Sequence, residues 1–163
     1  PETGLDIWLV ELQGERKPQP WLVTGFAEAA AVFSPDGKWI AYQSDASGQF
    51  EIYVKSFPGP GAAHRVTTAG GREPLWSRDG SELFYRQGDA MMATAVDTKG
   101  GFRSERPTLL FEGSYLTERS RANYDVSPDG ERFLMVQGGA PARQIKVVLN
   151  WAEELKRLVP VGN

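Results

Sequence analysis

Ser34-Pro-Asp-Gly37 is followed along this chain by two close copies, Ser77-Arg-Asp-Gly80 and Ser127-Pro-Asp-Gly130. Apolar residues flank each copy, as Phe33 and Trp39-Ile-Ala-Tyr42 flank the first. An Asp-Gly pair favours a tight turn, because glycine accepts a positive φ and the aspartate side chain bonds to the backbone. Each copy therefore predicts a β-hairpin, and we interpret six residues as turn residues: Asp36, Gly37, Asp79, Gly80, Asp129 and Gly130.

The spacing of these turns indicates a larger repeat. Their serines are 43 and 50 residues apart, a period that suits a propeller blade of four short strands. The third strand of the blade repeats too, since Glu51-Ile-Tyr-Val54 matches Asp6-Ile-Trp-Leu9. In both places a loop with proline and glycine follows, and then a fourth strand, Arg65-Val-Thr-Thr68 or Trp21-Leu-Val-Thr24. The predicted fold class is all-β, a β-propeller of four-stranded antiparallel blades, with about 3.5 blades in this chain.

We predict one partial propeller over residues 1–163. Its expected parts are a half blade over 5–25, full blades over 28–69 and 71–112, a three-stranded last blade over 121–149 and a short α-helix over 150–159. The helix is predicted because Asn150 and Glu153 form a capping-box pattern ahead of an apolar face. The loop Gly113–Arg121 is the largest departure from the period.

The composition excludes several classes of function. The formal net charge is −3 without a basic block, so no nucleic acid is expected as a partner. No apolar run approaches the roughly 18 residues of a membrane helix, so no membrane insertion by this chain is expected. The absence of cysteine excludes disulfides, zinc–thiolate sites and cysteine nucleophiles, and it leaves the cellular compartment open.

The sequence offers no catalytic constellation. His64 is the only histidine, and it lies at the start of an outer strand, where we expect an ordinary surface residue. The loop Ser44–Gly48 with Glu51 resembles a calcium loop only loosely, because it has too few carboxylates. We therefore predict no catalytic residue, no metal and no cofactor. Seven aromatic residues are expected to pack between blades: Trp8, Trp39, Tyr42, Tyr53, Trp76, Phe84 and Tyr85.

Ligands of propellers gather at the channel mouth, which is built from the loops between blades and the starts of the innermost strands. Charged or polar residues without an evident ion partner in the sequence are the candidates for binding there. The predicted ligand-binding residues are Glu28, Arg72, Glu73, Arg119, Arg121 and Asn123.

Two resemblances follow from these motifs. The Ser-Pro-Asp-Gly hairpins with (Asp/Glu)-Ile-(Trp/Tyr) on the third strand resemble the WD40-like PD40 repeat of the TolB propeller and of tricorn- and prolyl-oligopeptidase-type propellers. The stretch from Ser127 to Met135, together with Ile145 to Leu158, resembles the C-terminus of large bacterial serine/threonine protein kinases. The second resemblance implies the last part of a sensor propeller, in a compartment set by the parent protein. Kinase motifs are absent from this chain, so it is not expected to be an enzyme.

Three functions stay open at this point. The first is a non-catalytic sensing or interaction module that binds a protein, a peptide or a small ligand on its channel face. The second is a propeller hydrolase or lyase with a site in the channel, and the third is a purely structural half-propeller. Because an incomplete ring leaves open sheet edges, we also expect a homodimer that closes a six- or seven-bladed ring.

Overall fold

The computed structural model describes residues 4–118 and 120–138. This part of the chain forms thirteen strands. They are β1 (Ile7–Val10), β2 (Pro18–Leu22), β3 (Glu28–Phe33), β4 (Trp39–Ser44), β5 (Glu51–Ser56), β6 (His64–Arg65), β7 (Arg72–Trp76), β8 (Glu82–Gln87), β9 (Ala90–Asp97), β10 (Arg103–Ser104), β11 (Thr108–Glu112), β12 (Tyr124–Val126) and β13 (Phe133–Met135). The predicted helix over 150–159 and the third strand of the last blade lie outside the described residues. No helix that could cross a membrane is found within residues 4–118 and 120–138.

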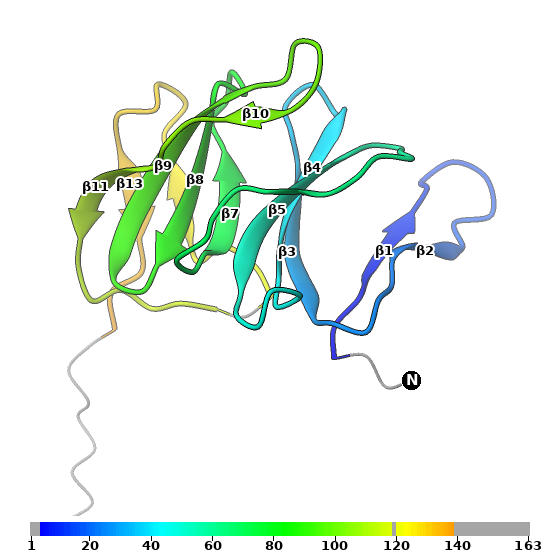
Figure 1. The fold of residues 1–163 in the computed structure, drawn as a ribbon, viewed down its shortest axis with the longest axis horizontal. Helices are drawn as coiled ribbons and strands as arrows, with labels where there is room; N and C mark the ends of the chain where they lie inside the picture. Colours follow the sequence, from blue (N-terminus) through cyan, green and yellow to red (C-terminus); the bar gives the residue numbers. More distant parts are fainter. Residues whose placement is uncertain (1–3, 119, 139–163) are drawn as a thin grey trace, which may run out of the picture.

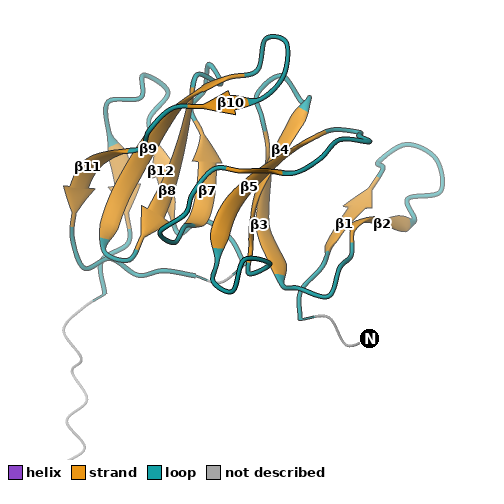
Figure 2. Ribbon diagram, in the orientation of Figure 1, coloured by secondary structure: helices purple, strands orange, loops and turns teal. Residues whose placement is uncertain are grey.

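The strands form separate antiparallel sheets that follow one another in chain order (Figures 1 and 2). One complete sheet has the order β3-β4-β5-β6. The next runs β7-β8-β9, and both β10 and β11 pair with β9. A two-stranded sheet stands at each end, β1-β2 before the complete sheets and β12-β13 after them. The all-β prediction is confirmed.

Apolar side chains fill the spaces between successive sheets. The first core cluster lies between the two complete sheets and consists of Ala41, Ile52, Val54, Val66, Trp76, Leu83, Tyr85 and Phe102. The second lies between the β7–β9 sheet and β12-β13 and consists of Phe84, Met91, Ala93 and Tyr124, with Phe133 and Met135 packed against it. Strand β8 thus contributes alternate residues to both clusters, as expected of a sheet that is covered on both faces.

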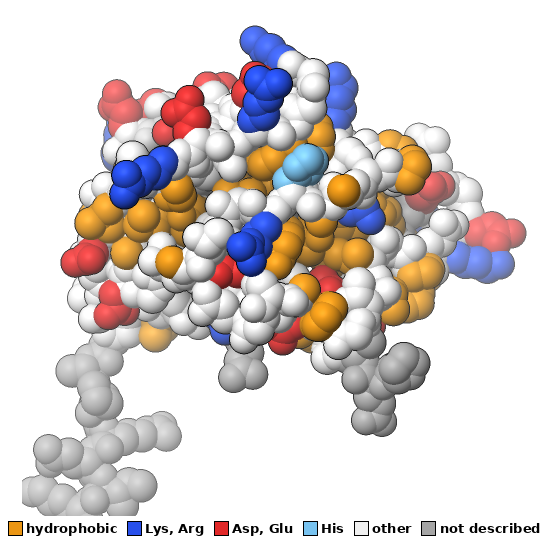
Figure 3. Space-filling view, viewed as in Figure 1, with side chains coloured by type: hydrophobic (Ala, Val, Ile, Leu, Met, Phe, Trp, Pro, Cys, Tyr) orange, Lys and Arg blue, Asp and Glu red, His pale blue; other side chains and the backbone are white. Residues whose placement is uncertain are grey.

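The prediction that the aromatic residues pack between blades is correct for most of them. Tyr42, Trp76, Phe84 and Tyr85 are buried, and Trp39 and Tyr53 are half-buried. The prediction was wrong for Trp8, which is 54% exposed, because no described sheet covers its face of β1. Hydrophobic side chains also reach the surface elsewhere on the face in Figure 3.

The three predicted turns share one hydrogen-bond pattern. The serine hydroxyl donates to the aspartate Oδ1, over 2.6 Å for Ser34 and Asp36 and 2.7 Å for Ser77 and Asp79. The serine Oγ then accepts the N–H at the start of the next strand, from Trp39 at 3.0 Å in the first turn. The same contacts recur in the third turn, from Ser127 to Asp129. Gly37, Gly80 and Gly130 have φ of 69°, 73° and 75°, which is the conformation that required glycine.

Replacing Asp79 by alanine is expected to lower the melting temperature near neutral pH, because the aspartate holds the hydroxyls of Ser77 and Ser81 and the N–H of Ser81. These bonds lower the pKa of Asp79 from 3.8 to about 2, with the Ser77 hydroxyl contributing most. A group whose pKa is lower in the folded than in the unfolded state stabilises the fold at pH values above its unfolded-state pKa. That stabilisation is lost as the pH falls toward the folded-state pKa. The melting temperatures of the wild-type chain and of Asp79→Asn should therefore differ near neutral pH, and this difference should shrink between pH 3.8 and about 2. A pH-independent difference would contradict this role of the charge.

The passage from the first complete sheet to the second is tightly packed. Glu51 is buried and accepts bonds from the Thr67 hydroxyl and from the Gly70 N–H, the latter at 3.1 Å. A Cβ on Gly71 would lie 2.7 Å from Thr67 Oγ1 and 2.8 Å from Ile52 Cγ1. Gly70 and Gly71 therefore let the chain cross between sheets, and they do not form a phosphate loop.

The single histidine lies at the surface, pale blue in Figure 3. His64 belongs to the outer strand β6, and its ring packs against Phe102 at 5.5 Å and Trp39 at 6.2 Å between ring centroids. No described serine or carboxylate bonds to it in the manner of a catalytic triad, so its contacts are those of an exposed side chain resting on aromatic neighbours.

Candidate functional site

The innermost strands β3 and β7 carry the same irregularity. Their registers with β4 and β8 shift between Ala29 and Val32 and between Arg72 and Leu75. Within these bulges Ala30 has a φ of 52° and Glu73 a φ of 56°, values that residues other than glycine rarely adopt. Each residue stands four positions before the serine of its turn, so the bulge belongs to the repeat.

Glu73 uses this bulge to hold the long loop before β12. Its side chain is 0% exposed, and its carboxylate accepts the Glu118 N–H at 2.5 Å and the Asn123 N–H at 3.3 Å. The Tyr124 hydroxyl donates to the Glu73 carbonyl at 2.8 Å. Burial raises the pKa of Glu73, and the two N–H bonds partly offset that rise. The carboxylate therefore acts as an internal clamp between β7 and β12.

Two buried polar residues near Glu73 occupy equivalent positions in successive repeats. Gln43 stands nine residues after Ser34, and its Oε1 accepts the Glu73 N–H at 3.0 Å. Arg86 stands nine residues after Ser77, is 2% exposed and donates from Nη2 to the Gly88 carbonyl at 3.1 Å. Its Nε and Nη1 have no hydrogen-bond partner within the described residues, and its guanidinium lies 5.7 Å from the Tyr115 ring.

Glu28 is also an interior group. It accepts bonds from the hydroxyls of Thr24 at 2.6 Å and Ser44 at 3.4 Å. Burial is the largest cause that raises the pKa of Glu28, and the nearby charges of Asp6 and Asp45 raise it further. Glu28 thus fastens the crossing from β2 to β3 onto the end of β4.

Arg72 is one candidate that remains available to a ligand. It is half-buried, and its guanidinium stacks over the Phe50 ring at 4.0 Å. No ion pair to Arg72 is formed within residues 4–118 and 120–138. Phe50 also lines a surface hollow of about 570 Å³, together with Gly4, Leu5, Ala27, Asp45 and Ser120. The hollow is mostly apolar, and it brings together segments from the first and last parts of the described chain.

The six predicted binding residues therefore separate into groups. Glu73 and Asn123 are in contact, while Glu28 is bonded inside the β2–β3 crossing. Arg121 is exposed, and Arg119 lies outside the described residues. Sequence reasoning missed Arg86 and Phe50. Alignment of the repeats could have found Arg86, since it occupies the position of Gln43, whereas nothing in the sequence indicated that Phe50 would support Arg72.

The carboxylates of the calcium-like loop are already engaged. Asp45 Oδ1 accepts the Ala27 N–H at 2.8 Å, and Glu51 accepts from Gln49 Nε2 at 2.7 Å in addition to Thr67 and Gly70. Among the described residues, no three side chains of His, Asp or Glu gather closely enough to hold a metal ion. Two of the turn aspartates, Asp79 and Asp129, line one hollow of about 430 Å³.

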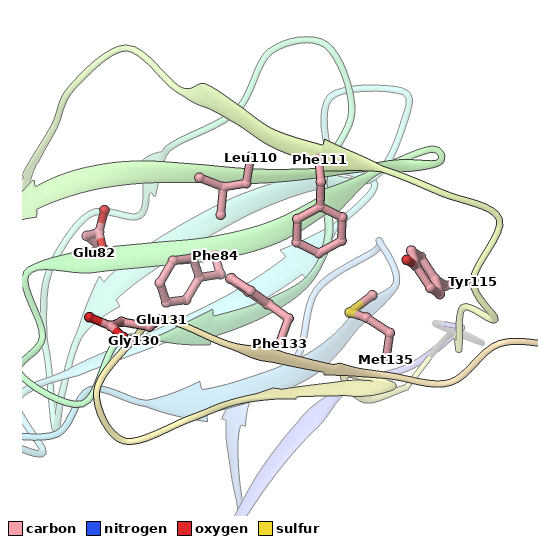
Figure 4. A pocket seen from close by; sticks show the side chains of 9 residues that line it. All are labelled: Glu82, Phe84, Leu110, Phe111, Tyr115, Gly130, Glu131, Phe133 and Met135. Carbon is pink, nitrogen blue, oxygen red and sulfur yellow. The ribbon is translucent and has the colours of Figure 1, made fainter.

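A third hollow lies between the last two sheets. It has a volume of about 510 Å³ and is lined by Glu82, Phe84, Leu110, Phe111, Tyr115, Gly130, Glu131, Phe133 and Met135. Figure 4 shows Phe84, Phe111, Phe133 and Met135 converging on it, with the two glutamates grouped at one end. We call this hollow the β13 groove. Most of its lining residues are aromatic or aliphatic, so it suits apolar side chains better than a charged ligand.

Comparison with known proteins identifies the fold. No protein-family model matches the chain, and no curated protein matches it. Among solved structures, it is similar to a protein described as a TolB from Agrobacterium tumefaciens, with a TM-score of 0.53, 21% identity, and coverage of 80% of this chain and 49% of that one. It is also similar to a protein described as a 6-phosphogluconolactonase from Bacteroides uniformis, with a TM-score of 0.50, 18% identity, and coverage of 80% and 40%.

These likenesses concern the fold alone. The chain spans about half the length of the solved structures that it resembles. Its sheets are thus arranged as in a TolB-type β-propeller, which confirms the PD40/TolB resemblance at the level of the fold.

Proposed function

We propose that this chain is a non-catalytic interaction module, which binds a protein or peptide segment at Arg72 and the adjacent 570 Å³ hollow. The observation that carries the proposal is Arg72, held against Phe50 beside the 570 Å³ hollow without an ion pair to any described residue. Stacking orients a guanidinium while it leaves the N–H groups free to bind a carboxylate. The apolar lining beside it suits a neighbouring apolar side chain of the same segment.

The hydrogen bonds of the acidic residues near the starts of the innermost strands support binding over catalysis. Glu28, Glu73 and Asp45 accept hydrogen bonds from the protein's own backbone or hydroxyl groups. His64 lies on the outer strand β6. A hydrolase or lyase needs an acid–base pair or an activated nucleophile within reach of one substrate. We therefore propose that the ligand is bound without being transformed.

Replacing Arg72 by glutamine is expected to weaken peptide binding about tenfold, as for the loss of one charge-assisted hydrogen bond. The probe is a fluorescein-labelled peptide of alternating phenylalanine and glutamate, titrated with the 163-residue chain and followed by fluorescence anisotropy. Arg65→Gln is the matched control, because Arg65 lies exposed on the outer strand β6.

Binding that is saturable, sensitive to Arg72→Gln and insensitive to Arg65→Gln supports the proposal. Substitution of glutamine for glutamate in the peptide should remove the difference between wild type and Arg72→Gln. The proposal is overturned if the wild-type chain does not bind the peptide, or if the two variants bind it equally.

We further propose that the module belongs to a larger protein and that it self-associates. The resemblance of Ser127–Met135 and Ile145–Leu158 to the C-terminus of bacterial serine/threonine kinases supports a place in a sensor propeller of about 3.5 blades per chain, with the 150–159 helix at its end. No residue of this chain is proposed to transfer a phosphoryl group. Self-association as a homodimer is supported by exposed apolar residues at both end sheets, Trp8 and Val10 on β1 and Leu134 on β13.

A further inference from the structure

The two end sheets are complementary halves of one blade. Strand β13 follows the Ser-Pro-Asp-Gly turn, as β4 and β8 follow theirs, so it is a second strand. Strand β1 matches β5 in sequence, so it is a third strand. In the complete sheets the second strand pairs with the third, β4 with β5 and β8 with β9. Among the described residues, β13 and β1 each lack that partner.

The repeat also fixes the register in which these two edges would meet. Tyr42 pairs with Tyr53 between β4 and β5. Met135 stands eight residues after Ser127, as Tyr42 stands eight after Ser34, and Trp8 holds the place of Tyr53 in its strand. Met135 would therefore lie opposite Trp8.

The other pairs follow from the same register. Ala41 pairs with Val54, which places Leu134 opposite Leu9. Ile40 pairs with Lys55, which places Phe133 opposite Val10.

In this register, the side chain of Trp8 would point toward the β13 groove. Tyr42 faces the preceding sheet, since its ring meets Trp21 edge-on at 6.0 Å, and Tyr53 stacks beside it at 5.8 Å between centroids. A tryptophan in the place of Tyr53 next to Met135 would likewise face the preceding sheet. On that side of β13 lies the β13 groove, with Phe111 and Phe133 in its lining (Figure 4).

We propose that the β13 groove is the docking site for strand β1 of a second copy of this chain. Pairing of β13 with β1 of the second copy completes a four-stranded blade, β12-β13-β1-β2. Trp8 and Val10 of the second copy then enter the groove. The reciprocal contact forms a second shared blade, so two complete and two half blades from each chain close a ring of six blades. This arrangement deepens the self-association proposed above and is independent of the Arg72 ligand.

A second copy accounts for both exposed edges with one kind of contact. Trp8, 54% exposed, gains an apolar groove, and the edges of β1 and β13 that lack a partner among the described residues both gain a ladder. Leu134, 73% exposed on the other face of β13, is covered as well. The sheet that follows β1 is the β3–β6 sheet, which β1 already contacts through β3, and in the ring it would pack over Leu134. A third strand from the same chain, as predicted for the last blade over 121–149, would fill only the β13 edge.

The natural absence of cysteine makes the register directly testable by cross-linking. The double variant Leu9→Cys with Leu134→Cys places one thiol on each strand at positions that should face each other. Cβ atoms directly opposite across two strands are about 4.5–5.5 Å apart, within reach of a disulfide after a small adjustment. Leu9→Cys with Val136→Cys is the matched control, since its second thiol is two residues out of register on the same face.

On mild oxidation, the Leu9/Leu134 variant should become a covalent dimer on a non-reducing gel, while the control variant should stay largely monomeric on that gel. Light scattering of the wild-type chain should give a mass near twice 18.0 kDa. Trp8→Asp should weaken dimerisation about 30-fold or more, the typical effect of losing a buried interface tryptophan. Because Trp8 is exposed in the single chain, the circular dichroism spectrum of Trp8→Asp should match that of the wild-type chain.

Every other result contradicts one part of the proposal. A monomeric wild-type mass removes self-association and the shared blade together, but it leaves the peptide test of Arg72 untouched. A dimer that cross-links equally in both double variants, or in neither, removes the shared blade while self-association stands. A dimer unaffected by Trp8→Asp overturns the placement of Trp8 in the β13 groove.

Discussion

Leu83→Ala should lower the free energy of unfolding by about 2–5 kcal/mol, the range found for leucine removal from packed cores. Leu83 is 0% exposed and lies in the cluster that joins the two complete sheets, beside Ile52 and Val54 from the facing sheet. Removing its isobutyl group leaves a cavity that two rigid sheets cannot close. The effect should therefore fall in the upper part of that range.

Chemical denaturation at fixed protein concentration measures this loss, since self-association would otherwise change the apparent stability. Leu12→Ala is the matched control, because Leu12 is 79% exposed and should change the unfolding free energy by less than about 0.5 kcal/mol. Equal effects of the two substitutions would show that the sheets do not pack through Leu83.

Glu73→Ala is expected to have the second largest effect and to act on the loop before β12. The substitution leaves the N–H groups of Glu118 and Asn123 without their acceptor, at a cost of about 1–3 kcal/mol for each group that stays buried. Residues 113–123 should then become more sensitive to limited proteolysis, with the β3–β6 sheet unaffected. Denaturation and the position of the first proteolytic cut measure the two consequences separately.

Glu73→Gln distinguishes the charge of this group from its shape. The glutamine keeps one acceptor oxygen, so it should recover part of the stability that Glu73→Ala loses. Burial raises the pKa of Glu73 above its ordinary value of 4.5, so the folded chain holds this proton more tightly than the unfolded chain does. The corresponding stabilisation is present below pH 4.5 and is lost as the pH rises through the folded-state pKa. Glu73→Gln should remove this component, and an unchanged pH profile would contradict it.

The repeated turns made the fold predictable, because their information is local. Ser34, Asp36 and Gly37 bond to one another and to the next strand, so three residue types at fixed spacing specify the hairpin. The same spacing placed the second and third strands. The fourth strands were harder to place, since β6 has only two residues and β9 pairs with both β10 and β11.

The candidate site was less predictable, because its contacts join distant parts of the chain. Charge at the strand starts drew attention to Glu73 and Arg72, but it did not distinguish a buried carboxylate that holds a loop from a cation without an ion pair. Glu73 is distinguished by Asn123, which is 50 residues away, and Arg72 by Phe50 on the preceding sheet. Trp8 shows the same limit, since its position in the repeat indicated core packing while its neighbours in space decide its exposure.

The order of the strands has a consequence for synthesis. Each sheet in the described chain is built from strands that are consecutive in sequence, so its hydrogen bonds need no segment that emerges much later from the ribosome. The β3–β6 sheet can form as soon as Arg65 has emerged, and β7–β11 can then fold against it. The sheets can thus fold one after another from the N-terminal side, each packing against the sheet that formed before it. In the shared blade proposed above, the half-blades at the two ends of this series would be completed last, by a strand from a second copy.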